Sequence, residues 1–461
     1  MPAAARRSIA VLGAGITGLT AAHRLIQQGH RVRLFESSAR TGGAIRTVYT
    51  DGWLIEEGPN TALTGEPALT ALIAELGLAG EVVTANPAAK NRYIVRGGRP
   101  IPAPLSPPAF LKSPLFSLGA RLKILAEARF RPRVRTADLS LEDFVRAHFG
   151  QQAVDYGLNP FVTGVYAGDP KRLSARHAFP KLWETEQKHG SLLRGQIVEA
   201  RARQARGEKR PEIISFERGL QTLPDALTAR LPDGTLTLRA HLEALVPAAD
   251  GRWSVIWHAG AATQTETFDT VLAALPAPGL AQLRLGTLGE RPLASLDTID
   301  HPPVSSLFLG YRRDQVAHAL DGFGVLIPAV EKRAALGILF SSTLFPGRAP
   351  EGHVALTVLV GGTRQPELAR LPTEKILAAI APDLRDLLGV QGTPAFQRHT
   401  FWPRAIPQYN LGRERHLETI AATETAHCGL LIGGQARDGI ALPACLAAGE
   451  KLAARALALV S

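Results

Sequence analysis

Apolar and polar positions near the start of the chain follow a strand, a helix and a second strand. Ile9, Val11 and Leu12 form a short apolar run, which predicts a buried strand. Apolar residues then recur at helical spacing, and a second apolar run ends at Glu36; the helical positions are Leu19, Ala22, Leu25 and Ile26. This order predicts the first unit of a parallel sheet with a crossover helix.

Three glycines occupy the turn between the first strand and the helix. Gly13, Gly15 and Gly18 have the spacing G-x-G-x-x-G, in which they allow the tight turn, the approach of a pyrophosphate and close helix packing. Glu36 follows about twenty residues later, where a carboxylate can accept hydrogen bonds from ribose hydroxyls. These features predict a dinucleotide site. Its assigned residues are Gly13, Gly15, Ile16, Thr17, Gly18 and Glu36.

A second glycine turn, in "SSARTGGAIRT", follows Glu36. It resembles the double-glycine motif of the FAD-dependent amine oxidase and phytoene desaturase superfamily, in which this loop extends the pyrophosphate site toward the flavin. The segments "FERGLQTLPDAL" (216–227) and "TVLAALPAP" (270–278) resemble the central flavin-domain segments of the same superfamily. The resemblance implies cofactor contacts at Arg40, Gly42, Gly43, Gly58 and Leu242.

The C-terminal part of the chain supplies a second half of this site. Leu430 to Ile432 predict a strand, two glycines turn it, and Pro443 is well placed to open a helix. The positive end of that helix would face the electron-rich edge of a reduced flavin ring. NAD would not need such a half-site, so we expect FAD. The residues assigned here are Gly433, Gly434, Ile440 and Leu442.

Composition narrows the class of protein. The 461 residues are 45% hydrophobic and 20% charged, which is typical of a folded chain with more than one domain. A net charge of +11 suits an anionic partner, but no nucleic-acid motif is present, so nucleic acid is not expected. With only Cys428 and Cys445, we expect neither a disulfide framework nor a thiol metal site, and no residue is assigned to a metal. The absence of a membrane-spanning apolar run favours an intracellular protein.

Several segments carry a more specific resemblance. "NPFVTGVYAGDPKRLSARHAFPKLWETEQKHGSLLRG" (159–195) is similar to the protoporphyrinogen oxidases, oxygen-dependent flavoenzymes of haem and chlorophyll synthesis. The segments 56–61, 323–362 and 401–409 and the C-terminal "DGIAL" share that similarity, which runs nearly the full length. The resemblance implies six-electron oxidation of protoporphyrinogen IX by FAD and oxygen. It supplies no general base, and the sequence marks none.

The same resemblance implies a tetrapyrrole pocket. Arg92, in "NRYIV", corresponds to an arginine that pairs with a propionate, and a guanidinium binds a carboxylate with two hydrogen bonds. Leu326 and Leu339 correspond to aliphatic residues that sandwich a pyrrole ring. Leu359 replaces an aromatic residue of the plant enzymes, which puts the detailed shape of the pocket in doubt. The full predicted set is Asn60, Arg92, Gly164, Leu326, Leu339 and Leu359.

Three other functions remain open from the sequence. Coproporphyrinogen III carries four carboxylates, which the basic surplus would also suit. A generic amine oxidase would need an aromatic pair beside the flavin, which the sequence does not reveal. A non-catalytic porphyrin carrier would retain the flavin motifs without the reaction.

Apolar residues among prolines, flanked by basic residues, characterise residues 100–135. The stretch "PIPAPLSPPAFLKSPLFSLGARLKILAEARFRPRVR" is typical of a segment that enters an anionic membrane surface, although a helical lid over the active site would fit as well. We expect peripheral contact with the inner face of the cell membrane, from the cytoplasm. A homodimer is a weaker expectation, from the resemblance alone.

The predicted architecture is α/β, with a discontinuous Rossmann-like FAD domain of residues 1–86, 212–300 and 410–461. A mixed-sheet substrate domain (87–105, 195–211 and 301–409) and a helical membrane-contact domain (106–194) are inserted in it. Within these, residues 201–212 are interpreted as a solvated linker.

Overall fold

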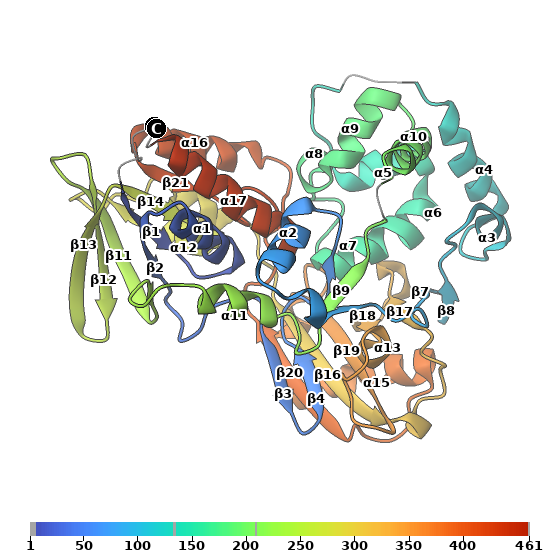
Figure 1. Cartoon of the computed structure of the whole chain (residues 1–461). Coiled ribbons are helices and arrows are strands. Elements are labelled where there is room, and N and C mark those ends of the chain that lie inside the picture. The colour runs from blue at the N-terminus through green and yellow to red at the C-terminus, as the bar shows by residue number, and fades with distance from the viewer. Residues whose placement is uncertain (1–5, 132–134, 208–209, 460–461) are drawn as a thin grey trace.

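The computed structural model describes residues 6–131, 135–207 and 210–459. Figure 1 shows three bodies: a nucleotide-binding domain at the left, a large sheet below, and a helical unit at the upper right. The α/β class and the mixed second sheet are confirmed. No helix among the described residues is long and apolar enough to cross a membrane.

A five-stranded parallel sheet organises the nucleotide-binding domain. Its order is β10 (Leu236–Thr237), β2 (Arg31–Phe35), β1 (Ser8–Leu12), β14 (Thr270–Ala273) and β21 (Leu430–Ile432). Side chains of β1 alternate between two cores, as the period of a strand requires: Ile9 and Val11 face one, Ala10 and Leu12 the other. The sheet therefore joins strands from both ends of the chain and from its middle.

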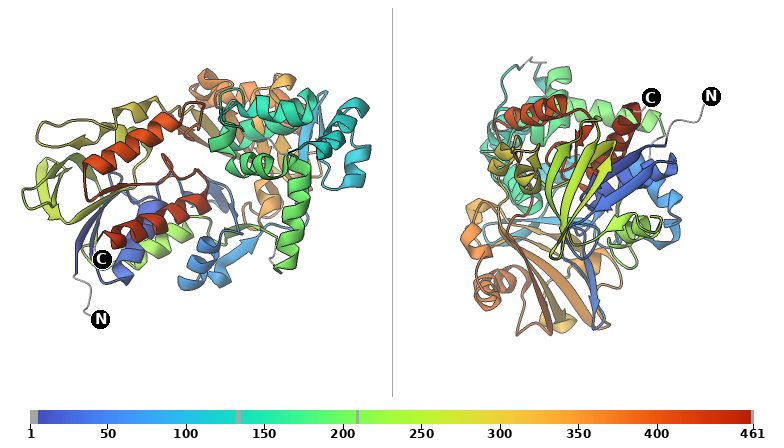
Figure 2. Two further views of the ribbon diagram at one scale, coloured as in Figure 1. Left: turned by 90° about the horizontal axis from the view of Figure 1, so that it is seen from above. Right: turned by 90° about the vertical axis from the view of Figure 1, so that its left-hand side faces the viewer.

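Helices cover the first face of this sheet. The helices are α1 (Ile16–Gln27), α2 (Pro67–Glu75), α11 (Thr222–Ala229) and α17 (Leu442–Ala458). Figure 2 shows α17 beside the N-terminal helix α1, although the two lie at opposite ends of the sequence. Their close packing requires Gly449, because a side chain there would approach the carbonyl of Thr17 to 2.5 Å.

An antiparallel sheet covers the second face. It contains β11 (Ala240–Pro247), β12 (Trp253–Ala259), β13 (Ala262–Phe268) and the short β15 (Arg284–Leu285). Trp257 and Phe268 pack here on Phe35 of β2, with ring centroids 4.8 and 6.0 Å away. Helices α12 (Ala277–Gln282) and α16 (Glu414–Ala426) complete this side.

The second body is a seven-stranded mixed sheet. Its order is β20 (Phe396–Trp402), β16 (Val304–Arg312), β19 (His353–Gly361), β18 (Ala335–Leu339), β17 (Gly322–Leu326), β7 (Asn91–Arg96) and β8 (Arg99–Pro102). Helix α15 (Thr373–Leu388) buries one face through Ile376, Ile380 and Leu384. On the other face lies the hairpin of β3 (Thr47–Thr50) and β4 (Trp53–Glu56), whose Trp53 stacks on Phe396. The remaining short elements include β5 (Ala62–Leu63), β6 (Val82–Thr84), β9 (Ile213–Phe216), α13 (Ser341–Leu344) and α14 (Pro366–Ala369).

The third body is helical. It contains α3 (Pro107–Lys112), α4 (Leu118–Ala126), α5 (Leu141–Phe149), α6 (Gln151–Ala153), α7 (Asn159–Tyr166), α8 (Ala175–Ala178), α9 (Pro180–His189) and α10 (Leu192–Ala205). Phe144 and Trp183 centre its core. Helix α10 packs on α9 near Gly195 and continues to Ala205, so residues 195–205 belong to a helix of this body. Residues 201–205 are therefore helical and not an irregular linker, although most of them are exposed, as the solvated interpretation expects. Residues 208–209 of the proposed linker lie outside the described residues.

The centre of the helical unit also holds a buried charged network. His148 lies 2.7 Å from Glu127 through Nδ1 and 3.1 Å from Glu186 through Nε2. Glu127 also accepts hydrogen bonds from Ser191 and from the backbone N–H groups of Leu192 and Leu193, and Glu186 accepts one from Arg135. Every charged group of this network therefore has a partner.

Candidate active site

The turn between β1 and α1 is shaped by its glycines. Gly13 has a φ of +95°, and a Cβ added there would lie 2.8 Å from the carbonyl oxygen of Ala274. A Cβ on Gly18 would overlap the carbonyl of Gly13. By contrast, a Cβ on Gly15 would meet no atom within 4 Å. The chain therefore leaves open space beside Gly15, at the uncapped start of α1, as a bound phosphate requires.

Glu36 holds the glycine turn from the end of β2. One carboxylate oxygen accepts a hydrogen bond of 2.8 Å from the N–H of Ala14, and the other accepts one of 2.8 Å from the N–H of Ser38. The oxygen that accepts from Ala14 keeps a further lone pair for a ribose hydroxyl. The predicted position of Glu36, directly after the second strand, is confirmed.

The second glycine turn lies against the first. The N–H of Gly42 donates to the carbonyl of Ala14 over 2.8 Å, and Gly42 pairs with Gly15 in an isolated parallel bridge. Arg40 donates to the carbonyls of Thr41, Gly43 and Ile45 over 2.6 to 3.0 Å. Burial lowers the pKa of its guanidinium. Arg40 thus braces the loop from within, while Gly42 and Gly43 form the surface beside Gly15.

The C-terminal half of the cradle meets the first at α1. Gly434, with a φ of +98°, turns the chain after β21. The hydroxyl of Thr17 donates to the carbonyl of Cys445 over 2.9 Å. Pro443 lies in the first turn of α17, as predicted, and no side chain caps that helix. Two uncapped helix starts therefore lie together, which suits an anionic cofactor.

The remaining predicted cofactor residues frame this cradle. Gly58 lies against Ala44, which directly follows the second glycine turn. A Cβ on Gly58 would overlap the carbonyl of Ala44. Leu242 is half-buried on β11 opposite Trp257. Gly433 abuts Leu452 of α17, and Ile440 and Leu442 lead into that helix. Their contact with FAD remains a prediction.

The three predicted substrate leucines lie on one face of the seven-stranded sheet. Leu326 pairs with Gly337, Gly337 with Leu359, and Leu339 with Thr357, so the register points their side chains the same way. This is the face opposite α15, and all three leucines are half-buried. We call this surface the leucine face; it consists of Leu326, Leu339 and Leu359. The sequence could not establish it without the strand register.

Gly164 of α7 lies directly on the leucine face. A Cβ there would overlap Cδ2 of Leu326, so only glycine allows this approach. The helical unit thereby contacts the sheet at the predicted substrate wall.

Arg92 lies at the edge of the same face, on β7. It is exposed, and its guanidinium is 5.4 Å from the ring centre of Phe323. Among the described residues no carboxylate pairs with Arg92. By contrast, Arg398 on β20, at the opposite edge of the sheet, forms an ion pair with Glu57 at 2.5 Å. Arg92 is therefore available to an anionic ligand.

Asn60 borders a small cavity between the hairpin and the sheet. Phe308 and Thr357, on the side of the sheet that carries the leucine face, line it as well. The sequence analysis missed two further lining residues, Glu56 and Arg348, which form a buried pair at 3.9 Å. Burial raises the pKa of Glu56 to about 7 and lowers that of Arg348. The only signal of this pair in the sequence is that Glu56 and Arg348 each follow a largely apolar segment.

Comparison with known proteins decides the family. The model of the flavin-containing amine oxidoreductases matches residues 16–457. The chain belongs to this family. It is accordingly an FAD-dependent oxidoreductase, as the cradle indicates.

Individual relatives give finer detail. The chain is 33% identical to a mitochondrial protoporphyrinogen oxidase of Nicotiana tabacum, over 96% of this chain and 93% of the relative. It is 27% identical to the coproporphyrinogen III oxidase of Bacillus subtilis (strain 168), over 98% of each. A solved structure from Exiguobacterium sp. 255-15, provisionally named a protoporphyrinogen oxidase, matches with a TM-score of 0.82 at 23% identity over 98% of both chains. That structure shares the fold.

Proposed function

We propose that this flavoenzyme oxidises a porphyrinogen to the corresponding porphyrin, with protoporphyrinogen IX as the preferred substrate. The observation that carries the proposal is the leucine face, a half-buried apolar wall with the unpaired Arg92 at its edge. An apolar macrocycle with carboxylate arms needs this combination. Protoporphyrinogen oxidases are also among the relatives at 30% identity or more.

The residues of the site would orient the macrocycle. Arg92 would bind one propionate with two hydrogen bonds, and the leucines would hold the rings and exclude water. Gly164 would let α7 pack directly on Leu326 and so hold that leucine in place against the ring. Bound FAD would supply two-electron oxidation in three cycles, each followed by reoxidation with oxygen.

One cationic neighbour of Arg92, Arg96, is not free to bind a carboxylate, which favours a dicarboxylate over a tetracarboxylate. Arg96, four residues along β7, is 4.6 Å from the ring centre of Tyr156 and donates to the carbonyl of Leu115. It is therefore engaged within the protein. Arg92 alone of this pair is available, which suits the two propionates of protoporphyrinogen IX better than four carboxylates.

Anaerobic stopped-flow mixing tests the proposal directly. We expect protoporphyrinogen IX to bleach the flavin absorbance quickly, and Arg92→Ala to need a higher substrate concentration. Arg99→Ala, an exposed arginine on the adjacent β8, is the matched control and should behave as wild type. Faster bleaching with coproporphyrinogen III would move the protein to that substrate. No bleaching with either would leave a carrier.

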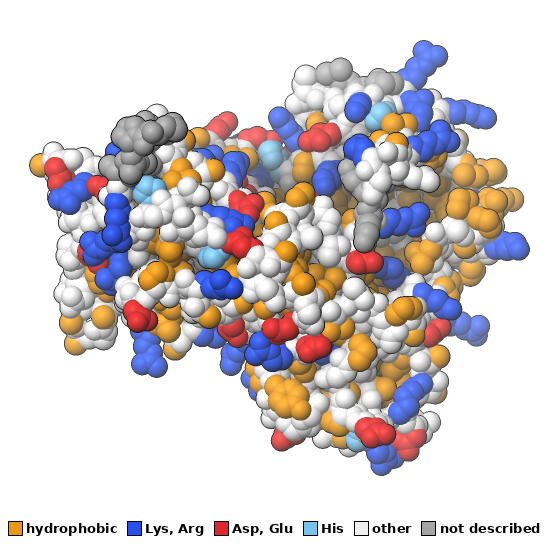
Figure 3. Space-filling view, in the orientation of Figure 1, with side chains coloured by type: hydrophobic (Ala, Val, Ile, Leu, Met, Phe, Trp, Pro, Cys, Tyr) orange, Lys and Arg blue, Asp and Glu red, His pale blue; other side chains and the backbone are white. Residues whose placement is uncertain are grey.

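We further propose that the helical unit rests on an anionic membrane. Leu105, Leu111, Leu118, Leu122 and Leu125 are 48 to 67% exposed along α3, α4 and the preceding loop. Figure 3 shows hydrophobic side chains gathered at this right-hand edge, beside lysines and arginines. An exposed apolar patch with flanking cations fits a lipid surface.

Flotation with vesicles tests the membrane contact. The protein should float with vesicles that contain phosphatidylserine, and Leu118→Asp with Leu122→Asp should abolish flotation. Leu288→Asp, an 88% exposed leucine outside the helical unit, is the control. Equal flotation of all three proteins would contradict the proposal.

A further inference from the structure

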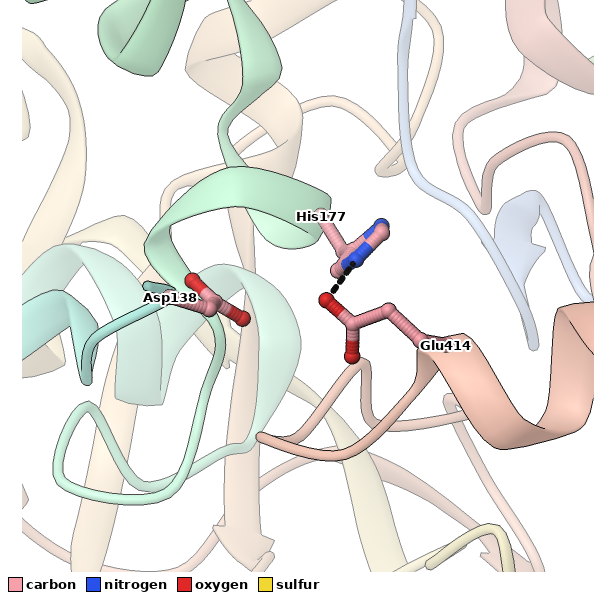
Figure 4. A group of neighbouring side chains, drawn as sticks. All are labelled: Asp138, His177 and Glu414. Carbon is pink, nitrogen blue, oxygen red and sulfur yellow. Dashed lines mark hydrogen bonds and ion pairs between the residues drawn. The ribbon is translucent and has the colours of Figure 1, made fainter. Parts of the chain in front are cut away.

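Three potential metal ligands meet where the helical unit touches the nucleotide-binding domain. Asp138 precedes α5, His177 lies on α8, and Glu414 is the first residue of α16. Their ligand atoms all lie within 4.8 Å of one another. Figure 4 shows the three side chains converging from separate elements. His177 Nε2 lies 2.8 Å from Glu414 Oε1.

Asp138 is held with one oxygen unused. Its Oδ1 accepts hydrogen bonds from the N–H groups of Leu139, over 2.9 Å, and Arg176, over 3.3 Å. Its Oδ2 is shielded from solvent and has no hydrogen-bond donor among the described residues. A buried carboxylate oxygen without a partner is costly, so this atom points to a missing ligand.

The network around His148 provides an internal comparison. It places one histidine between two glutamates, and protein donors satisfy each carboxylate there. The carboxylates of that network leave no vacant position for an ion. At His177 the corresponding position, Oδ2 of Asp138, stays open.

We propose that Asp138, His177 and Glu414 bind a divalent cation of the zinc type, with water as a fourth ligand. One imidazole and two carboxylates form a donor set that Zn²⁺ accepts. Ligand atoms around tetrahedral zinc lie about 3.4 Å apart, so modest side-chain rotations close the present spread. The double charge of the ion balances the two carboxylates.

The bound ion ties the helical unit to the nucleotide-binding domain. The same contact already contains the hydrogen bond of 2.9 Å from the N–H of Ser174 to the carbonyl of Tyr409, and a bridge between Leu173 and Asn410. Zinc therefore stabilises this docking, whichever substrate the enzyme takes.

Zinc uptake by the FAD-loaded protein tests the site. After chelator treatment and equilibrium dialysis against ZnCl₂, we expect the wild-type chain to bind one zinc ion. Its midpoint of thermal unfolding should then be higher than that of the chelator-treated protein without zinc. His177→Asn and Glu414→Gln should each lose both effects. The control His258→Asn should keep them, since His258 is an exposed histidine with a single glutamate, Glu243, 3.1 Å away.

Two results would overturn the proposal. Equal zinc uptake by wild type and both ligand variants would show that zinc binds elsewhere. No uptake by wild type would leave His177 as an ion-pair partner of Glu414 only. Both readouts are independent of porphyrinogen oxidation.

Discussion

Gly164 of α7 lies so close to Leu326 of β17 that no side chain fits between them. This contact joins the helical unit to the leucine face. Because Leu326 has a flexible side chain, Gly164→Ala should fold but push Leu326 out of place. We expect a several-fold rise in KM for the porphyrinogen with little change in thermal stability. The control is Gly157→Ala, because Gly157 is a glycine of the helical unit with open space around it. An unchanged KM in Gly164→Ala would show that this contact does not affect substrate binding.

Gly18 and Gly15 should respond differently to the same change. In Gly18→Ala the new Cβ overlaps the carbonyl of Gly13, so the turn must distort and the protein should lose stability. In Gly15→Ala the Cβ enters open space, so the protein should fold normally but hold FAD weakly. Thermal unfolding and the flavin content after gel filtration distinguish the two. Full FAD occupancy in Gly15→Ala would mean that no phosphate lies there.

Glu56 should make stability depend on pH. Burial raises its pKa from 4.5 to about 7, so the folded protein binds more protons than the unfolded chain between these values. Its contribution is therefore fully present below pH 4.5 and is lost as the pH rises through 7, by up to about 3 kcal/mol. In Glu56→Gln, denaturation at several pH values should show a flatter dependence in this window.

Glu75 provides a control of opposite sign. Although burial acts in the other direction, hydrogen bonds from Arg24, His23 and Gln27 lower its pKa to about 2. Its contribution is present above pH 4.5 and is lost as the pH falls toward 2. Glu75→Gln should thus leave the window above pH 4.5 unchanged. An identical slope there for Glu56→Gln and wild type would refute the role of Glu56.

His148→Asn should destabilise the helical unit strongly. The change leaves the fully buried Glu127 and Glu186 without the ring between them, and breaking such a buried network costs about 3–5 kcal/mol. Limited proteolysis should then cut within residues 106–205 before the rest of the chain. His258→Asn, at the surface, should show the wild-type pattern, and a matching pattern for His148→Asn would contradict this account.

Local pattern was sufficient to predict the nucleotide end. The spacing of Gly13, Gly15 and Gly18 and the position of Glu36 follow from short-range geometry, and the structure places each where that geometry requires. The strand at Leu430 to Ile432 and the helix opened by Pro443 also agree. Such features depend on neighbours within a few residues.

Features that depend on distant parts of the chain could not be predicted. Glu56 and Arg348 pair although they lie far apart in the sequence, and Asp138, His177 and Glu414 come from three separate segments. Tertiary contact, not local propensity, decides these cases. Residues 201–205 differ, because they continue α10 while mostly exposed, and the helix propensity of alanine, arginine and glutamine accounts for them.

The order of the parallel sheet has a consequence for biosynthesis. β1 and α1 are synthesised long before β21 and α17, which complete the cradle through Thr17 and Cys445. A growing chain therefore carries only half a flavin site until α17 has been made. Binding of the cofactor in the complete cradle has to wait for that helix.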